Sequence, residues 1–244
     1  MIDWKVGTLK SAQMVASNVK SLIFEVPDFD VHKAGQHVNI KLNSSDGYSA
    51  ERDYSIANAP EQSGTIELGV QLLEDGEVSP YLYQMQAGDK IEIRGPIGGH
   101  FVWDISMAGP LILIGGGSGM VPLMSMLRHH INNLEKDQFR KIIFLISART
   151  EDKILYREEL LNLENQDKNL KLVTALTSET PENWTGYTRR IDKEMLKEVL
   201  DQLKDQLPMI YVCGPTPFVE SVANNLVHLG FNSHEIKTER FGGA

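Results

Sequence analysis

The first hundred residues alternate apolar and polar side chains over short stretches separated by turn-forming residues. An alternation with a period of two is typical of β-strands that have one buried face. Short strands at regular spacing favour a small closed or sandwiched antiparallel sheet. We therefore predict a six-stranded antiparallel β-barrel, whose clearest strands cover residues 20–26, 37–42, 65–70 and 90–94.

The pattern changes near residues 107–110, where continuous apolar runs begin to alternate with helical stretches. Strands without polar alternation are buried on both faces, and helices between them indicate a parallel sheet covered on each side. We predict that this α/β half is a five-stranded parallel sheet and divide the chain into domains of residues 1–106 and 107–244. The predicted strands are 111–114, 142–146, 170–176, 209–212 and 235–238, and the predicted helices are 119–133, 153–164, 192–205 and 216–229.

Charge and cysteine content narrow the classes of function. The chain has 244 residues and a net charge of −9, which argues against nucleic acid as its main partner because such a partner needs a basic surface. Cys213 is the only cysteine, so the chain can supply neither an internal disulfide nor the thiolates of an iron–sulfur cluster. Any redox centre is therefore an organic cofactor.

We expect no metal site and no membrane span. The seven histidines are scattered, and the adjacent His129 and His130 point away from each other on a predicted helix. The N-terminal residues lack the long apolar core of a signal peptide, and no apolar run approaches the ~18 residues needed to cross a bilayer. These features predict a cytoplasmic protein.

Arg52, Tyr54 and Ser55 form the most informative motif of the first half. In a strand, Arg52 and Tyr54 share one face while Ser55 lies on the other. A forked guanidinium matches phosphate oxygens and an aromatic face matches a planar ring. A surface arginine beside a core tyrosine would give the same pattern, so the motif needs support from elsewhere in the chain.

A second phosphate-binding candidate follows at residues 75–79. Gly76 stands at a bend, and Ser79 occupies an N-cap position before a helix-like stretch at residues 80–84. Backbone N–H groups at a helix start suit a diphosphate.

The second half carries a glycine-rich loop directly after its first predicted strand. Gly116, Gly117 and Gly119 allow the backbone to approach a pyrophosphate, and Pro122 lies in the first turn of the following helix. A buried strand, a glycine turn and a helix start together form the context that a nucleotide phosphate requires.

Two further motifs complete the order along the chain. Cys213, Gly214 and Pro215 end the fourth parallel strand, at the edge where open sheets bind ligands. Glu239 and Phe241 lie close to the C-terminal end. In this order the motifs resemble those of the ferredoxin–NADP reductase superfamily, flavoproteins that pass electrons between a nicotinamide nucleotide and a one-electron carrier.

On the flavin side, the resemblance implies an FAD-binding barrel. Arg52 would contact the pyrophosphate, Tyr54 would stack on the isoalloxazine ring, and Ser55 would lie near flavin N5. The Gly-x-Val-Ser element formed by Gly76, Val78 and Ser79 would bind the diphosphate, and the backbone around Val70 would line the flavin. The turn at residues 95–101 matches the Gly-Pro-x-Gly turn that closes the barrel in this family.

On the nicotinamide side, the resemblance implies that Cys213 lies beside the nicotinamide C4 without acting as a nucleophile. Phe241 would cover the flavin and swing aside for the nicotinamide, and Glu239 would handle protons or place that ring. The predicted catalytic set is therefore Ser55, Cys213, Glu239 and Phe241, with Gly116, Gly117, Gly119, Pro122, Gly214 and Pro215 around the nucleotide.

The choice between NADPH and NADH depends on cations for the extra phosphate. Arg149 follows the second parallel strand, and Arg189 and Arg190 lie in a later loop. The Ser-Arg pair that many NADPH-using relatives carry after the third strand is replaced here by Thr177 and Ser178, and Arg190 is the candidate to supply the missing charge. A solvated role for the two loop arginines is the alternative, and the sequence favours NADPH slightly.

We therefore predict an NAD(P)H-dependent FAD reductase that passes single electrons to a separate protein acceptor, such as ferredoxin, flavodoxin, or an oxygenase, haem or molybdenum partner. Short segments at residues 79–82, 184–192 and 239–242 resemble stand-alone bacterial members without an iron–sulfur domain. We expect a monomer or weak dimer. Alternatives are a non-autonomous flavin-binding subunit of a larger redox complex and a flavin-free nucleotide-binding module.

Overall fold

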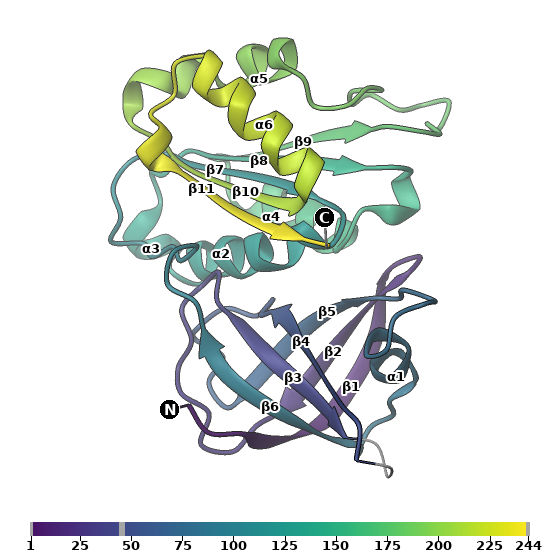
Figure 1. Cartoon of the computed structure of the whole chain (residues 1–244). Helices are drawn as coiled ribbons and strands as arrows, with labels where there is room; N and C mark the ends of the chain where they lie inside the picture. The colour runs from purple at the N-terminus through teal and green to yellow at the C-terminus, as the bar shows by residue number, and fades with distance from the viewer. Residues whose placement is uncertain (1, 44–46, 243–244) are drawn as a thin grey trace.

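A computed structural model describes residues 2–43 and 47–242 and arranges their strands in two sheets (Figure 1). The strands are β1 (Lys5–Ala16), β2 (Val19–Glu25), β3 (His37–Asn43), β4 (Ser49–Ser55), β5 (Thr65–Gln71), β6 (Lys90–Ile97), β7 (Leu111–Gly116), β8 (Ile142–Ala148), β9 (Leu170–Leu176), β10 (Met209–Pro215) and β11 (Ile236–Phe241). The helices are α1 (Ser79–Gln84), α2 (Met120–Asn132), α3 (Leu134–Asp137), α4 (Arg157–Gln166), α5 (Lys193–Leu200) and α6 (Thr216–His228). Short 3₁₀ turns cover Gly117–Gly119, Glu151–Lys153, Asp201–Gln206 and Ser233–Glu235.

The first sheet is antiparallel and has the strand order β4-β3-β6-β1-β2-β5. Its two edge strands approach each other, and a bridge between Ile56 and Leu68 helps to close the sheet into a barrel. Apolar side chains from alternate positions of its strands fill the interior, among them Leu22, Phe24 and Ile40. The predicted six-stranded antiparallel barrel is confirmed, and β1 is the strand that the apolar pattern did not locate.

The second sheet is parallel and has the strand order β11-β10-β7-β8-β9. Figure 1 shows α5 and α6 on one face of this sheet and α2, α3 and α4 on the face that looks toward the barrel. The predicted five-stranded parallel sheet with helices on both faces is therefore confirmed. Within the described residues, no helix combines the length and the apolar character that crossing a membrane requires.

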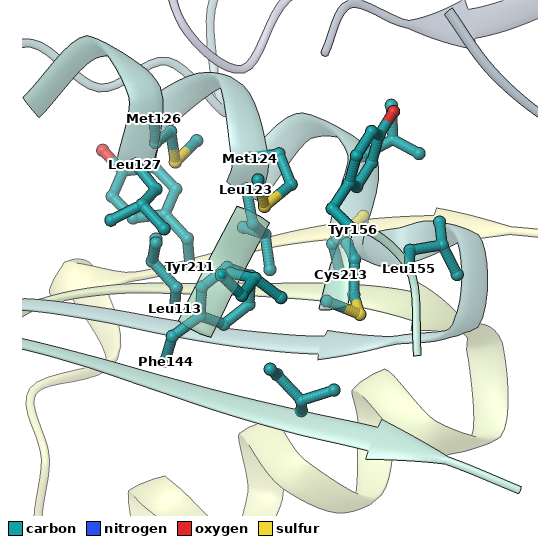
Figure 2. Close-up of a cluster of buried hydrophobic side chains, with 14 of the residues drawn as sticks. Leu113, Leu123, Met124, Met126, Leu127, Phe144, Leu155, Tyr156, Tyr211 and Cys213 are labelled. Atoms are coloured by element: carbon teal, nitrogen blue, oxygen red, sulfur yellow. The ribbon is translucent and has the colours of Figure 1, made fainter. Parts of the chain in front are cut away.

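Alternate residues of the central strands serve two separate core layers. Leu113 and Tyr211 point toward the barrel, whereas Ile114 and Val212 point toward α5 and α6. Figure 2 shows side chains of α2 packed onto the barrel-facing layer, which also contains Cys213. This layer continues into the barrel half through the buried residues Val19, Ala34, Ala57, Phe101 and Trp103.

One predicted helix begins later than its periodicity suggested. The prediction was 153–164, but α4 starts at Arg157, because Tyr156 adopts a left-handed backbone conformation with φ of 55°. The apolar residues Ile154, Leu155 and Tyr156 are buried in the barrel-facing layer from this irregular segment. Their apolar pattern therefore reports burial rather than a helix.

The outer edge of β9 is covered by the chain itself. The N–H of Tyr187 donates to the Thr174 carbonyl at 2.9 Å, and the N–H of Leu176 donates to the Tyr187 carbonyl at 2.9 Å. Beside them, the Glu164 carboxylate accepts a hydrogen bond from the N–H of Leu172 at 2.7 Å. These three backbone groups of β9, which an edge strand would leave open, are thus satisfied within the molecule.

The loop after β7 passes very close to the end of β10. A Cβ added at Gly119 would lie 2.2 Å from the Cys213 carbonyl oxygen and 2.6 Å from the Gly214 nitrogen, both of which are backbone atoms. We expect Gly119→Ala to destabilise the protein by about 1–3 kcal/mol, the usual range for overpacking. The Tm would fall by about 2–4 °C for each kcal/mol.

Gly99→Ala is the matched control in thermal unfolding, because a Cβ there meets no atom of the described residues within 4 Å. Equal Tm values for the two variants would contradict the close approach at Gly119.

Candidate functional site

The predicted flavin-side residues lie on an edge strand of the barrel. Ser55 ends β4 and pairs with His37 of β3, and Asp53 pairs with Asn39 on the same face. Asn39 donates a side-chain hydrogen bond to Asp53 at 2.8 Å. Tyr54 is half-buried against the barrel core, and burial raises the pKa of its phenol to about 12. The tyrosine therefore stays neutral and offers an apolar ring at neutral pH.

The structure brings Arg52 next to the 76–79 element. The Arg52 guanidinium forms an ion pair with Glu77, with 2.9 Å between Nη2 and Oε2. Gly76 fits tightly at the bend, since a Cβ there would lie 2.9 Å from Ser79 Oγ. A cation and a tight backbone turn therefore meet at one place, as a diphosphate site requires.

Ser79 does not cap α1 as predicted. Val78 is the N-cap residue, and Ser79 is already the first residue of the helix. Its hydroxyl accepts a hydrogen bond from the Leu73 N–H at 3.1 Å and thereby pins the preceding turn. Val78 and Val70 both point into the barrel core, so only their backbone can face a ligand.

Two predicted catalytic residues carry buried polar atoms that lack a hydrogen-bond partner among the described residues. They are the Ser55 hydroxyl and Oε2 of Glu239. His37 connects them: it pairs with Ser55 across the β3–β4 ladder, and its Nδ1 lies 3.9 Å from Glu239 Oε1. Buried polar atoms left unpaired are costly, and polar groups of a bound ligand can satisfy them. This region therefore fits the polar edge of a flavin ring.

Cys213 and Glu239 reach this region from the parallel sheet. They are direct neighbours in the β10–β11 register, and Cys213 shares the barrel-facing side of β10 with Tyr211. Burial, with a smaller contribution from Glu239, raises the pKa of the Cys213 thiol well above its usual range. The thiol therefore remains protonated, which makes it a poor nucleophile.

Glu239 is the most strongly perturbed carboxyl of this region. Burial raises its pKa to about 7, and the nearby Asp53 carboxylate adds to the shift. Burial also lowers the pKa of the His37 imidazole, against the opposing effect of Asp53. A carboxyl that exchanges its proton near neutral pH suits a role in proton handling.

The glycine loop forms one wall of the nucleotide side. Gly117 has a φ of +56°, and a Cβ there would meet no described atom within 4 Å, so its backbone faces open space. Gly116 lies against the Phe218 ring, 3.1 Å from a hypothetical Cβ. Pro122 is buried in the first turn of α2. The partly exposed backbone of Gly117 and Ser118, just before a 13-residue helix, suits a pyrophosphate.

A cavity of about 630 Å³ opens at the carboxyl ends of the parallel strands. Gly116, Gly117 and Pro215 line it, together with the predicted cations Arg149 and Arg190. Asn18, Val19 and Gln71 of the barrel close its other side, so the cavity lies between the two halves. Its position follows the rule that open α/β sheets bind ligands at this edge.

The two loop arginines have different environments. Arg189 forms an ion pair with Asp192 at 2.8 Å and stacks on the Tyr187 ring at 5.4 Å. Arg190 lines the cavity instead. Lys153, which the sequence analysis did not select, adds a third cation to the lining. The sequence could have indicated Lys153 by its position, since it lies four residues after Arg149 in the segment that follows β8.

The remaining predicted residues lie at the ends of β10 and β11. Phe241 pairs with Pro215 and is partly buried against the barrel-facing layer. Gly214 has a φ of +155°, and a Cβ there would lie 2.9 Å from the Phe218 ring. His37 and Asp53 were not selected as site residues, because only the register of β3 and β4 and the docking of β11 bring them to Glu239.

Family models match both halves of the chain. Residues 6–103 match an oxidoreductase FAD-binding domain, and residues 113–224 match an oxidoreductase NAD-binding domain.

Curated relatives are longer than this chain. One component of the Na(+)-translocating NADH-quinone reductase of Yersinia pseudotuberculosis is 34% identical over 257 residues, which cover 100% of this chain and 61% of the relative. NADH-cytochrome b5 reductase 2 of Chaetomium globosum is 29% identical over 227 residues, which cover 91% of this chain and 64% of the relative. The chain thus spans about three fifths of the length of these relatives.

Solved structures share the fold. A ferredoxin NADP+ reductase from Neisseria gonorrhoeae with bound FAD and NADP has a TM-score of 0.83 at 20% identity, over 98% of this chain and 99% of that chain. The FAD/NAD-binding domain of a nitric oxide dioxygenase from Vibrio cholerae has a TM-score of 0.84 at 20% identity, over 98% and 99% of the two chains.

The raised pKa of Glu239 predicts how stability depends on pH. Because its folded pKa of about 7 exceeds the ordinary 4.5, the folded protein retains this proton between those values, and stability falls as pH rises through that window. We expect the unfolding free energy of the wild type, relative to Glu239→Gln, to fall by about 2–3 kcal/mol between about pH 5 and pH 8. Urea denaturation of both proteins, in the same FAD-loading state, measures this. A pH-independent difference would show that Glu239 has an ordinary pKa.

Proposed function

The chain belongs to the ferredoxin–NADP reductase superfamily of FAD- and NAD(P)-binding oxidoreductases, and from this premise we propose that it is an NAD(P)H-dependent FAD reductase that passes electrons to a separate acceptor. One observation carries the proposal. The nucleotide cavity is lined by Pro215 at the end of β10, two residues after Cys213, which pairs with Glu239 of β11. Glu239 and Ser55 each hold a buried polar atom without a partner among the described residues. A nucleotide bound there would have its far end directed to a flavin site.

The residues of the barrel fit FAD. Arg52 and the backbone of residues 76–79 would hold the diphosphate, and Tyr54 would stack on the ring. The Ser55 hydroxyl, which has no hydrogen-bond partner among the described residues, would form a hydrogen bond with the flavin. When bound, FAD accepts a hydride from the nicotinamide and passes electrons one at a time to an acceptor.

The residues of the sheet would position the nicotinamide. Cys213 would present a neutral, buried thiol beside the ring, and Phe241 would shield the site from water. Glu239, protonated below about pH 7, would give up or take a proton near neutral pH. Bringing both rings together in a dry pocket is the main contribution of the protein.

A non-autonomous role is the second candidate. Relatives of this chain are named as one component of a Na(+)-translocating NADH-quinone reductase, and the chain spans 61% of their length. On this alternative, the protein would bind FAD and a nicotinamide but turn over only inside a larger redox complex. The physiological acceptor would then be another member of that complex.

Anaerobic visible spectroscopy tests the proposal. We expect FAD-loaded protein to lose its flavin absorbance when NADPH or NADH is added, and to turn over steadily with ferricyanide as an artificial acceptor. Bleaching without steady turnover would favour the non-autonomous role. Failure to bind FAD on reconstitution, or an unchanged flavin band with both nucleotides, would sink the reductase proposal.

We further propose NADPH as the preferred donor, because Arg149, Lys153 and Arg190 place three cations around the cavity. We expect Arg190→Gln to lower kcat/KM for NADPH by about tenfold, since a hydrogen bond to a charged group contributes about 1.5–3 kcal/mol. The value for NADH would change little. Arg189→Gln is the matched control, because Arg189 is already engaged by Asp192 and Tyr187. Equal losses for both donors would mean that Arg190 does not bind the extra phosphate.

A further inference from the structure

The helix that follows the glycine loop also contacts the barrel directly. Val121, Ser125 and Arg128 lie along one face of α2, because residues three or four apart stack on a helix. Val121 lies so close to Gly69 that a Cβ there would be 2.5 Å from a Val121 methyl. The Ser125 hydroxyl donates to the Asn58 carbonyl at 2.7 Å. One face of α2 thus follows the barrel segment that comes just after Ser55.

Arg128 is the charged centre of this contact. Its Nη1 donates to the Ala57 carbonyl at 2.9 Å and to Glu67 Oε2 at 2.8 Å, both in the barrel half. Its Nε and Nη2 donate to the two oxygens of Glu159 in α4, each at 2.6 Å. The guanidinium also lies 4.8 Å from the centre of the Tyr156 ring. One side chain therefore joins the barrel, α2 and α4.

The Arg128 contact is nearly shielded from water on its barrel side, whereas Glu159 is 34% exposed. The side chains of Arg128 and Glu67 are only 16% and 9% exposed. Glu67 is further held by the Ser21 hydroxyl, which donates to Oε1 at 2.7 Å. These partners, chiefly Glu159 and Glu67, raise the pKa of Arg128 despite its burial, so the guanidinium stays charged. Charge-assisted hydrogen bonds of this kind are short and directional.

The surrounding junction between the two halves combines an apolar layer with further hydrogen bonds, such as those of His129 in α2 and of Asn133 just after it with Glu61. Apolar contact is non-directional and favours burial without fixing a distance. The forked hydrogen bonds of Arg128 can fix what the apolar layer cannot, namely the separation of α2 from residues 57 and 67.

We propose that Arg128 is a positioning residue that sets the separation between the nicotinamide side and the flavin side of the site. The glycine loop at the start of α2 and the Ser55 end of β4 are each a short chain segment away from its contacts. Small errors in such a separation are costly, because misplacement by 1 Å can slow a reaction about 100-fold. This proposal rests on the reductase function proposed above.

Arg128→Lys keeps the positive charge but removes the forked hydrogen bonds of the guanidinium. The variant is compared with the wild type as FAD-loaded protein. We expect the limiting rate of flavin reduction at saturating nucleotide to fall about tenfold or more, with FAD content and nucleotide affinity near wild type. Amide hydrogen exchange gives a readout that does not need turnover. In Arg128→Lys, the exchange rates should increase together in residues 56–61 and 120–132.

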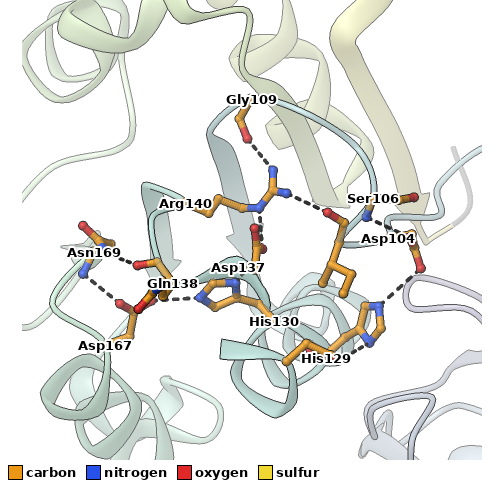
Figure 3. Close-up of polar contacts among 12 residues, drawn as sticks. Asp104, Ser106, Gly109, His129, His130, Asp137, Gln138, Arg140, Asp167 and Asn169 are labelled. Carbon is orange, nitrogen blue, oxygen red and sulfur yellow. Dashed lines mark hydrogen bonds and ion pairs between the residues drawn. The ribbon is translucent and has the colours of Figure 1, made fainter. Parts of the chain in front are cut away.

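Arg140→Lys is the matched control. Arg140 is also buried, at 7% exposure, and it bonds Asp137 and the Ile105 and Gly109 carbonyls, none of which is a hydrogen-bond partner of Arg128 (Figure 3). We expect it to lower the Tm without changing the limiting rate or the exchange of residues 56–61.

Glu67→Gln and Glu159→Gln separate positioning from stability. Each removes one carboxylate from Arg128, but only Glu67 belongs to the barrel. Positioning predicts the larger loss of limiting rate, and the larger exchange increase in residues 56–61, for Glu67→Gln. A larger loss of limiting rate in Glu159→Gln, which removes the two shorter bonds, would overturn the proposal. An Arg128→Lys protein with the wild-type limiting rate and wild-type hydrogen exchange would overturn it as well. If neither nucleotide reduces the wild-type flavin, the reductase function fails, and the exchange data alone decide the role of Arg128.

Discussion

The apolar layer between the parallel sheet and the barrel is the interaction on which the site depends. Tyr211 and Cys213 of β10 belong to it, as do Phe101 and Trp103 of the barrel half, so one continuous core serves both halves. Burial of this surface holds the carboxyl ends of β10 and β11 against the β3–β4 edge. Without it, Glu239 would not lie near His37, and the buried environment that raises its pKa would be lost.

Much of the fold and part of the site followed from the sequence because burial leaves a local pattern. The runs at residues 111–114 and 142–146 lack polar positions, and this predicted the parallel strands β7 and β8. The Cys-Gly-Pro motif predicted that Cys213 lies near the carboxyl end of a parallel strand, and it does so in β10. By contrast, β1 was not located, because five consecutive residues in its middle are exposed and give no clear alternation.

The parts that the sequence did not predict are set by contacts between distant segments. Nothing near His37 in the chain indicates that β11 will bring Glu239 to within 3.9 Å of it. The same holds for Arg128, which on its own helix looks like one more surface cation but is enclosed by Glu67 and Glu159. Tyr156 shows the opposite case, because the apolar pattern around it is typical of a helix although its own backbone is left-handed. Periodicity reports which side chains are buried, and docking decides what they meet.

The covered edge of β9 has a consequence for behaviour at high concentration. An open strand edge is a template for pairing with another chain, and such pairing is how many sheet proteins aggregate. Here residues 174–176 already exchange hydrogen bonds with Tyr187, and Glu164 occupies the N–H of Leu172. A second molecule would have to displace this segment before adding a strand. The parallel sheet is therefore protected on this side against growth into intermolecular assemblies.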